Sequence, residues 1–241
     1  MSAPSKKNLL PCLLLAAGRG ERMRPLTDTV PKPLLTIQGK SLLGWHLEAL
    51  AQAGLQQVII NHAWLGEKIE DALGDGQQFG MQITYSPEEV ALETAGGIYK
   101  ALSLMQPLDY FLVINGDIFC PHFPVGQLLG TCVQFRNIPN PPLAHLVMVP
   151  NPVQHPHGDF YLKDDQISED VSLGAEKLTF SGIGLYHRDL FQDLQIGVPF
   201  KLAPILVGAM RKHGVTGEKY TGPWHDVGTP QRLKDLNAAN E

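Results

Sequence analysis

The feature that most constrains this chain is an apolar run that ends in a glycine-rich turn. Leu9–Ala16 is almost unbroken in its apolar character, and Gly18-Arg19-Gly20 follows directly. A parallel strand that helices cover on both faces has this continuous apolar pattern. Two glycines after it allow the backbone to approach a ligand closely and to turn its N–H groups toward that ligand. The pattern predicts a buried parallel strand with a binding loop at its end.

Strand-like and helix-like segments then alternate through the first half. Ser41 is placed to cap a helix whose apolar residues recur at helical spacing, and Gly54 is placed to end it. Repeated units of this kind form a Rossmann-like three-layer α/β/α fold with a mostly parallel central sheet, whose ligands bind at the carboxyl ends of the strands. Further strands are expected at 58–60, 81–85 and 110–114, and further helices at 65–73 and 94–105.

The second half is less regular but shows no linker or repeat. A strand is expected at 144–149, and the segments 160–162 and 178–186 suggest a small antiparallel addition to the sheet. A helix at 203–212, a strand at 224–227 and a helix at 230–237 complete the chain. We therefore expect a single domain over 1–241, with a first part at about 9–120 and a second part at about 121–241.

Charge and cysteine content limit which kinds of binding partner and which cellular compartment are expected for this protein. The net charge is −5 and no basic run exceeds two residues, whereas a nucleic-acid partner favours a basic stripe. Three cysteines without C-x-x-C spacing indicate reduced thiols in a cytoplasmic protein. No stretch reaches the ~20 apolar residues of a membrane span. Lys6-Lys7 before the apolar run resembles a secretory leader, but cleavage there would remove the binding loop, so a strand is favoured.

The loop after the first strand carries a cluster of cations. Arg19, Arg22, Arg24 and Lys32 can neutralise a polyphosphate. The sequence does not match the P-loop pattern, and Met23 occupies the third glycine position of the dinucleotide fingerprint. The cluster therefore favours a triphosphate held by another kind of loop.

The run from Leu15 to Thr27, followed by Pro31-Lys32-Pro33-Leu34, resembles the signature of the sugar-1-phosphate nucleotidyltransferases. The resemblance covers nearly the whole chain and implies that the first part binds a nucleoside triphosphate and the second part a sugar-1-phosphate. It also implies that Arg22 and Lys32 are catalytic. The nucleotide-binding residues that it implies are Leu15, Ala16, Ala17, Gly18, Gly20, Glu21, Arg22, Lys32, Glu88, Thr94, Gly96 and Asn115.

Two carboxylates follow strand-like segments. Asp117 comes after the fourth predicted strand and Asp226 lies in the last one, and two such carboxylates can bind one Mg²⁺ together with phosphate oxygens and water. The resemblance implies that the two hold the catalytic metal together. For the sugar it implies Gly158, Ser181, Gly182 and Lys201, although Lys201 could equally be a lysine at a helix start. The Glu-Lys-Pro segment that many relatives carry between these turns is absent, so no sugar-binding glutamate is assigned.

The resemblance also bears on the substrates. The segments 61–66, 85–88, 92–97 and 200–204 are most similar to a uridylyltransferase, which implies UTP, and Glu88 could accept from the N3–H group of uracil. A mannose-1-phosphate guanylyltransferase and a non-catalytic nucleotide-sugar sensor are the alternatives. A glycosyltransferase is disfavoured because Asp117-Ile118-Phe119 lacks the D-x-D metal motif. His155-Pro156-His157 is more typical of a loop than of a metal pair, and a monomer or small homo-oligomer is expected.

Overall fold

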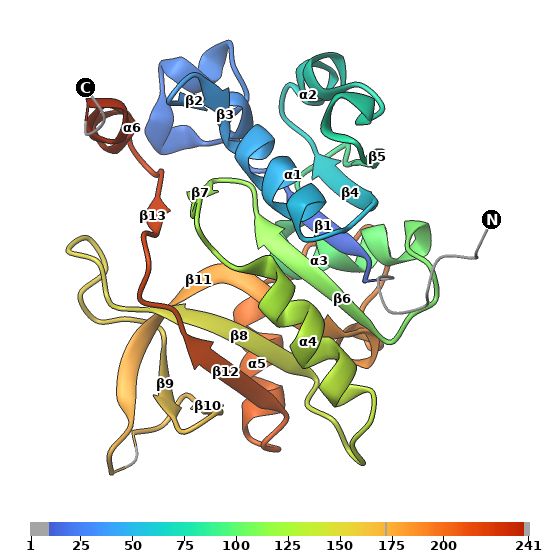
Figure 1. Ribbon diagram of the computed structural model, residues 1–241, viewed down its shortest axis with the longest axis vertical. Helices are drawn as coiled ribbons and strands as arrows, with labels where there is room; N and C mark the ends of the chain where they lie inside the picture. The colour runs from blue at the N-terminus through green and yellow to red at the C-terminus, as the bar shows by residue number, and fades with distance from the viewer. Residues whose placement is uncertain (1–9, 172, 239–241) are drawn as a thin grey trace.

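A nine-stranded sheet runs through the molecule in the order β5-β4-β1-β6-β11-β8-β12-β10-β9 (Figure 1). The computed structural model describes residues 10–171 and 173–238. The strands of the first half are β1 (Cys12–Leu15), β4 (Gln57–His62), β5 (Gln82–Pro87) and β6 (Tyr110–Asn115), and all four are parallel to one another. This part of the sheet matches the expectation of a buried parallel strand followed by βαβ units. Lys6 and Lys7 of the leader-like segment lie outside the described residues.

The second half of the sheet is built around one long antiparallel strand. β11 (Glu176–His187) lies between β6 and β8 (Ala144–Val149) and runs opposite to both, and β12 (Val215–Lys219) is parallel to β8. The short strands β9 (Phe160–Lys163) and β10 (Gln166–Ser168) complete the sheet with antiparallel pairings. The expected mostly parallel sheet with a small antiparallel addition is confirmed, since β5, β4, β1, β6, β8 and β12 share one direction.

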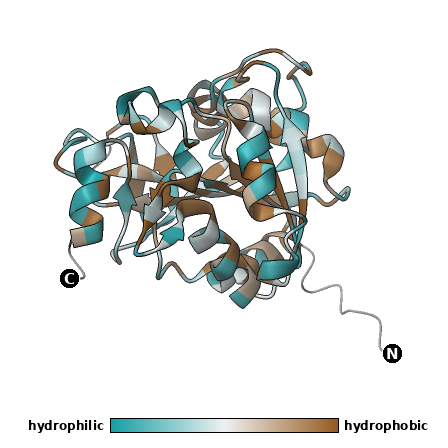
Figure 2. Ribbon diagram, turned by 90° about the horizontal axis from the view of Figure 1, so that it is seen from above, coloured by the Kyte–Doolittle hydropathy of each residue, from teal (hydrophilic) through white to brown (hydrophobic). Residues whose placement is uncertain are grey.

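Alternating side chains of the strands build a core on each face of the sheet. Leu14 of β1 packs with α1 (Leu42–Gln52), α2 (Gly66–Leu73) and α4 (Val125–Phe135). Its neighbour Leu13 packs on the other face. That face is covered by α3 (Glu93–Ala101) and α5 (Leu202–Met210). Figure 2 shows apolar residues concentrated between the two helical layers, so the three-layer arrangement is confirmed.

Local signals in the sequence place the first helix correctly. The Ser41 hydroxyl accepts a hydrogen bond from the Gly44 N–H at 3.0 Å, which caps α1. Gly54 adopts a left-handed φ of 88° just after the helix, as a terminating glycine does. By contrast, α4 and β12 were not expected. The α4 segment contains two glycines, Gly126 and Gly130, which weaken a helical pattern when it is judged from sequence alone.

The end of the chain crosses back from the second half to the first. After β12, residues 220–229 lead through β13 (His225–Asp226), which pairs with β7 (Ile118–Phe119), to α6 (Pro230–Ala238) beside the hairpin of β2 (Thr36–Ile37) and β3 (Lys40–Ser41) (Figure 1). A third small core joins these parts. Its buried members are Met23, Leu35, Ile37, Leu42, Phe119 and Val227, with Leu233 and Leu236 of α6 packed against it.

Several short 3-10 helices lie in the connecting segments: 21–23, 26–28, 32–34, 77–79, 102–104 and 188–191. The three cysteines are buried and free, and burial raises the pKa of the Cys120 thiol to about 12. In residues 10–171 and 173–238, no helix combines the length and the apolar character that a membrane crossing requires.

Candidate active site

Two cavities open at the carboxyl ends of the parallel strands and share a wall. The first has a volume of about 350 Å³ and is lined from the loop after β1, the end of β4 and the start of α3. The second has a volume of about 280 Å³ and lies against β11 and the loop before β9. Asn115 and Asp117, at the end of β6, line both cavities. We name them the nucleotide cavity and the sugar cavity, after the ligands that the sequence resemblance assigns to residues lining each of them.

The nucleotide cavity contains most of the residues that the resemblance assigned to the nucleotide. Main-chain segments after β1 form one side of it, and the loop before α3 forms the other. Of the twelve expected residues, eight line it: Leu15, Ala16, Ala17, Gly18, Lys32, Glu88, Thr94 and Asn115. The four that do not are Gly20, Glu21, Arg22 and Gly96. The sequence missed Pro33, Asn61, Ala91 and Glu93 as lining residues.

A buried hydrogen-bonded chain forms the floor of this cavity. Asn61, which is 2% exposed, accepts the Ala16 N–H through Oδ1 at 2.8 Å and donates from Nδ2 to Glu88 Oε1 at 2.7 Å. The other oxygen of Glu88 accepts the Leu92 N–H at 2.8 Å. Glu88, 5% exposed, therefore ties the loop before α3 to the phosphate loop. Asn61 could have been suspected, because it lies in the last two residues of β4, the strand beside β1, at the same edge of the sheet.

The structure separates the roles of the two adjacent glycines of α3. A Cβ on Gly97 would lie 2.7 Å from Glu88 Oε1 and 2.8 Å from Asn61 Nδ2, so Gly97 allows α3 to pack on the cavity floor. A Cβ on Gly96 would lie 2.7 Å from the Val198 carbonyl oxygen instead. Gly96 therefore allows close packing against the segment before α5, and its neighbour Gly97 contacts the floor.

The phosphate loop is stiffened by its own charges. Arg19 donates to the Thr27 carbonyl at 2.7 Å and to Asp28 at 3.1 Å, while its guanidinium stacks on the Trp64 ring. Arg24 pairs with Asp28 at 2.9 Å. Two of the four cations expected to neutralise a polyphosphate are thus engaged within the loop. Gly20, with φ of 69°, packs over the stem of Lys32.

Arg22 lies apart from the other loop cations. It is exposed and lines the sugar cavity together with Asp117 and Asp226. Glu21 is exposed and lies 3.6 Å from Arg24 and 3.8 Å from Arg19 in ion pairs. The structure therefore places Arg22 on the side of the second cavity, at the same edge of the sheet as the loop after β1.

Lys32 meets Asp117 at the wall between the two cavities. The Lys32 ammonium donates to Asp117 Oδ2 at 2.5 Å, and the Lys32 side chain is 8% exposed. Behind them, His46 of α1 lies 3.0 Å from the Ile118 carbonyl oxygen through Nε2. Burial lowers the pKa of His46 to about 4, so the ring is neutral at pH 7 and its Nε2–H donates to that carbonyl. His46 thus fixes the backbone that follows Asp117, a contact that the sequence did not reveal.

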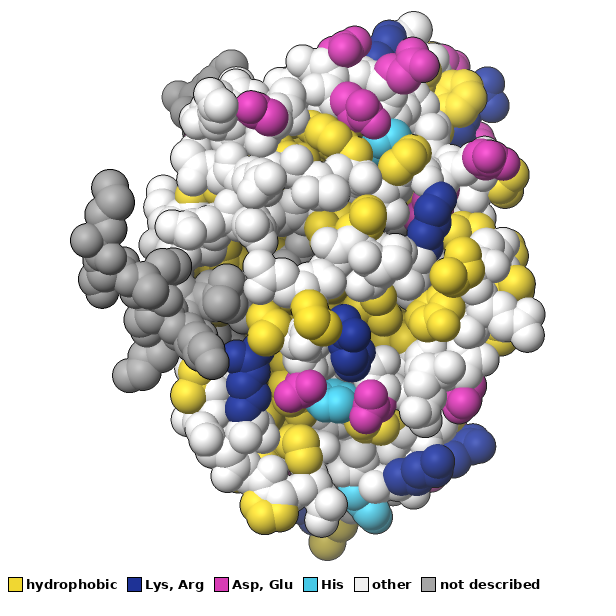
Figure 3. Space-filling view, turned by 90° about the vertical axis from the view of Figure 1, so that its right-hand side faces the viewer, with side chains coloured by type: hydrophobic (Ala, Val, Ile, Leu, Met, Phe, Trp, Pro, Cys, Tyr) yellow, Lys and Arg dark blue, Asp and Glu magenta, His cyan; other side chains and the backbone are white. Residues whose placement is uncertain are grey.

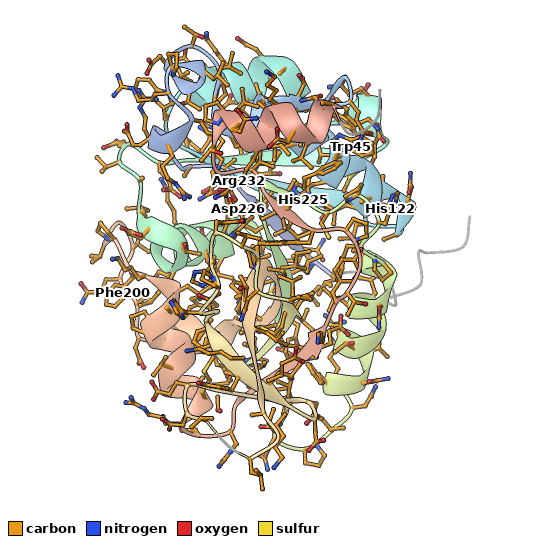
Figure 4. The ribbon with its side chains drawn as sticks, turned by 90° about the vertical axis from the view of Figure 1, so that its left-hand side faces the viewer. Trp45, His122, Phe200, His225, Asp226 and Arg232 are labelled. Carbon is orange, nitrogen blue, oxygen red and sulfur yellow. The ribbon has the colours of Figure 1, made fainter. Side chains whose placement is uncertain are left out.

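Asp226 reaches the same place from the far end of the chain. Antiparallel pairing sets Asp226 opposite Ile118, and the Val227 N–H donates to the Asp117 carbonyl oxygen at 3.2 Å. Asp226 Oδ2 accepts from Arg232 of α6 at 2.7 Å, and the two side chains face each other in Figure 4. The structure thus brings Asp117 and Asp226, which lie 109 positions apart in the sequence (226 − 117), to the lining of one cavity. Nothing in the sequence pointed to Arg232.

This pair of carboxylates fits a Mg²⁺ ion that is shared with a substrate. Mg²⁺ in phosphate-transfer sites is commonly held by one or two carboxylates, with phosphate oxygens and water as its other ligands. Asp117 and Asp226 line one cavity, and their side chains remain 39% and 29% exposed. Throughout the described ranges, no group of three or more His, Cys, Asp or Glu side chains could hold a metal.

The sugar cavity is lined by side chains from turns and from a bulge in β11. Ser181 lines it as expected, and its hydroxyl accepts the Ile183 N–H at 3.1 Å. The pairing of β11 with β8 shifts register between Phe180 and Gly184. The remaining lining residues beyond the shared wall are Arg22, Ile118, Pro152, Gln154, His155, Asp159, Thr179, Phe180, Trp224 and Asp226.

The other three expected sugar residues do not line this cavity. A Cβ on Gly182 would lie 2.6 Å from Asn115 Nδ2, so this glycine allows β11 to approach Asn115. A Cβ on Gly158 would lie 2.5 Å from Asn151 Oδ1, so its hydrogen faces a turn. Lys201 is exposed at the start of α5, after Phe200, whose carbonyl accepts the Ala95 N–H at 2.9 Å. Of the four residues expected to contact the sugar, Ser181 alone lines this cavity among the described residues, and side chains next to the other expected turns, such as Asp159 and Phe180, line it as well.

Comparison with known proteins agrees with this geometry. Residues 12–156 match the family model described as nucleotidyl transferase. An N-acetylmuramate alpha-1-phosphate uridylyltransferase from Neisseria meningitidis is 50% identical over 94% of this chain and 96% of its own length. A mannose-1-phosphate guanylyltransferase from Mycobacterium tuberculosis is 38% identical over 91% of this chain but 61% of its own length.

The fold has a solved counterpart as well. A Bacillus anthracis structure described as a glucose-1-phosphate thymidylyltransferase superposes with a TM-score of 0.80 at 20% identity, covering 95% of this chain and 94% of that one. At this identity the likeness establishes the fold alone. The family follows from the match to 12–156 and from the full-length identity of 50%. This chain therefore belongs to the sugar-1-phosphate nucleotidyltransferases of the nucleotidyl transferase family.

Proposed function

We propose that this chain joins UTP to N-acetylmuramate α-1-phosphate, giving UDP-N-acetylmuramate and pyrophosphate. The observation that carries the proposal is that the two cavities are adjacent and that Asn115 and Asp117 line both of them. A nucleotide in one cavity and a sugar phosphate in the other would meet at this wall. The full-length similarity to the Neisseria uridylyltransferase supports the choice of substrates.

The reaction is a direct in-line attack. An oxygen of the sugar phosphate attacks the α-phosphorus of UTP, the bond from that phosphorus to the bridging oxygen breaks, and pyrophosphate leaves. The attacking oxygen is already ionised, so no general base is required. The protein contributes orientation and charge stabilisation. Lys32, at the shared wall, contacts the phosphate at the reacting centre, and Arg22, beside it in the sugar cavity, stabilises the charge that develops on the phosphates.

Asp117 and Asp226 would hold the metal, with substrate phosphates completing its coordination. When bound there, Mg²⁺ supplies a Lewis acid that neutralises charge on the phosphate oxygens. Arg232 orients the Asp226 carboxylate, and His46 holds the backbone after Asp117. These two residues act through the ligands, and they do not contact the reacting atoms in this proposal.

The base would lie over the Asn61–Glu88 floor. Both oxygens of Glu88 already accept a protein hydrogen bond, from Asn61 and Leu92. A carboxylate oxygen can accept a second hydrogen bond, so Glu88 retains the capacity to accept from the N3–H group of uracil. Thr94 at the rim and the main chain around Gly18 contact the rest of the nucleotide.

The proposal also includes the cellular location of the reaction, its biological context and the protein's oligomeric state. We place the reaction in the cytoplasm and in the recycling of cell-wall amino sugars, with the protein as a monomer or small homo-oligomer that does not bind nucleic acid. On the face drawn in Figure 3, the Lys and Arg side chains of the described residues are interspersed with Asp and Glu side chains. Such a mixture lacks the one-sided field that attracts a nucleic-acid backbone.

The test is a pyrophosphate-release assay that crosses UTP and GTP with N-acetylmuramate-1-phosphate, N-acetylglucosamine-1-phosphate and mannose-1-phosphate. The proposal expects the fastest release from UTP with N-acetylmuramate-1-phosphate, and none without a divalent metal. Fastest release from GTP with mannose-1-phosphate would establish the guanylyltransferase alternative. Absence of release from every pair would favour a nucleotide-sugar sensor.

A further inference from the structure

His155 and Asp159 form a fixed pair on the wall of the sugar cavity. His155 Nε2 lies 3.0 Å from Asp159 Oδ1, and the Phe180 N–H donates to Asp159 Oδ2 at 2.8 Å. The His155 N–H itself donates to the Pro152 carbonyl at 2.8 Å, which holds the turn that presents the ring. Both residues line the cavity. The imidazole is therefore held by one hydrogen bond to Asp159, whose other oxygen is fixed by the Phe180 N–H of β11.

The hydrogen bond between His155 and Asp159 uses one ring nitrogen of His155 and leaves the other, Nδ1, to bind a ligand. Both Asp159 oxygens are engaged, so this carboxylate acts mainly as a support for His155. Nε2 is the nitrogen that bonds to Asp159, which leaves Nδ1 for a ligand. A ring that donates from Nε2 to Asp159 and from Nδ1 to an anionic acceptor makes charge-assisted hydrogen bonds, which are roughly twice as strong as neutral ones. The group that fits is an anion.

The positively charged groups of the cavity indicate that this anion is a different group from the phosphate of the sugar phosphate. Asp117, Asp159 and Asp226 line the cavity, and each of them pairs with a cation or an imidazole: Lys32, His155 and Arg232 respectively. Among the lining side chains that can carry positive charge, Arg22 belongs to the phosphate loop and His155 belongs to the wall that faces the sugar. A second anionic group on the sugar would therefore meet His155.

We propose that His155, positioned by Asp159, recognises a carboxylate on the sugar phosphate. This inference rests on the proposed function and names the determinant of its sugar. N-acetylmuramate differs from N-acetylglucosamine by a lactyl ether that ends in a carboxylate, and with its phosphate at the shared wall this group would extend toward the turn at 152–159. His155 is then a binding residue for the lactyl carboxylate, and Asp159 is a positioning residue.

The test compares the binding of two sugar phosphates that differ in the lactyl group. The dissociation constants of N-acetylmuramate-1-phosphate and N-acetylglucosamine-1-phosphate are measured by calorimetry, with Mg²⁺ and a UTP analogue that has a methylene bridge between the α- and β-phosphorus atoms. His155→Ala is expected to weaken binding of the acidic sugar about tenfold to a hundredfold. Binding of the neutral sugar is expected to change less than about twofold, because it makes no charged hydrogen bond to the ring.

Two further variants separate recognition from a structural effect. Asp159→Asn keeps the size of the side chain but removes its charge, and it should weaken the acidic sugar less than His155→Ala does. His157→Ala is the matched control, because His157 is exposed in the same turn and does not line the cavity. It should leave both dissociation constants and the KM for UTP unchanged. Thermal unfolding of each variant verifies that it folds.

The outcomes distinguish this inference from the proposed function. If wild-type protein makes UDP-N-acetylmuramate but His155→Ala weakens both sugars equally, or neither, the carboxylate site is refuted and the function stands. If wild-type protein does not turn over N-acetylmuramate-1-phosphate with UTP, the proposed function fails and the inference fails with it. A selective loss of the acidic sugar in His155→Ala supports both.

Discussion

The two cavities of this enzyme are built in different ways. The nucleotide cavity rests on side chains that are also part of the buried interior: Asn61 and Glu88 are 2% and 5% exposed and bond to each other. The sugar cavity has buried Thr179 and Ser181 of β11 on one side, but its other side is formed by turn residues such as Gln154, which is exposed, and His155, whose side chain is 45% exposed. A polar group that binds a ligand from a buried network also supports the fold, whereas a polar group on a turn can change with little effect on stability. We therefore expect substitutions to lower stability in the first cavity and to alter substrate choice in the second.

The largest effect is expected where the two cavities meet. Asp117→Asn keeps the shape of the side chain but removes the charge that would bind Mg²⁺. We expect kcat to fall by about 10³-fold, at the upper end of the loss of one transition-state contact. The measurement is pyrophosphate release at increasing Mg²⁺ concentrations. Activity within twofold of wild type would remove Asp117 from the metal site.

Lys32→Ala tests the role of the Lys32 ammonium, which lines the nucleotide cavity next to Asp117. Loss of its ammonium should lower kcat by about 10²–10³-fold. The fold should persist, because Asp117 remains partly exposed to solvent once Lys32 is gone. Lys212→Ala provides the control, since Lys212 is an exposed lysine after α5 that lines neither cavity. Near wild-type turnover in folded Lys32→Ala protein would refute the catalytic role.

Asn61→Ala and Gln154→Ala compare the two cavities directly. Asn61→Ala leaves the Ala16 N–H and the buried Glu88 carboxylate without their partner, so the free energy of unfolding should fall by about 2–4 kcal/mol. Gln154→Ala removes an exposed side chain and should change the free energy of unfolding by less than about 0.5 kcal/mol. Urea denaturation of both proteins measures the difference. Equal losses would show that the two cavities are not built differently.

A smaller effect than at Asp117 or Lys32 is expected at Arg232, which contacts Asp226 but lies outside the lining of both cavities. Arg232→Gln removes the guanidinium that orients Asp226 and should weaken Mg²⁺ by about tenfold, as loss of a residue that supports a metal ligand does. Binding of Mn²⁺, followed by electron paramagnetic resonance, reports this change independently of turnover. Unchanged Mn²⁺ binding would mean that the pair serves only to attach α6.

Local patterns predicted much of the first half of the chain. The Ser41 cap, the left-handed Gly54 and the buried strand β1 follow from residues near one another in the sequence. The second half was predicted less fully: α4 and β12 were missed, and Gly158 and Gly182 were expected to contact the sugar but face Asn151 and Asn115. A glycine indicates that space is tight, but the sequence does not show which neighbour needs the space.

The sequence by itself determined the family, the α/β class and most of the residues that line the nucleotide cavity, because a phosphate loop is a continuous segment whose glycines and cations lie close in sequence. The tertiary structure decided what crosses between distant segments. It pairs Asp226 with Arg232 beside Asp117, places Asn61 under the phosphate loop, and brings His155 to the wall of the sugar cavity. These contacts depend on how strands and turns far apart in the chain are packed, and no short-range pattern records that packing.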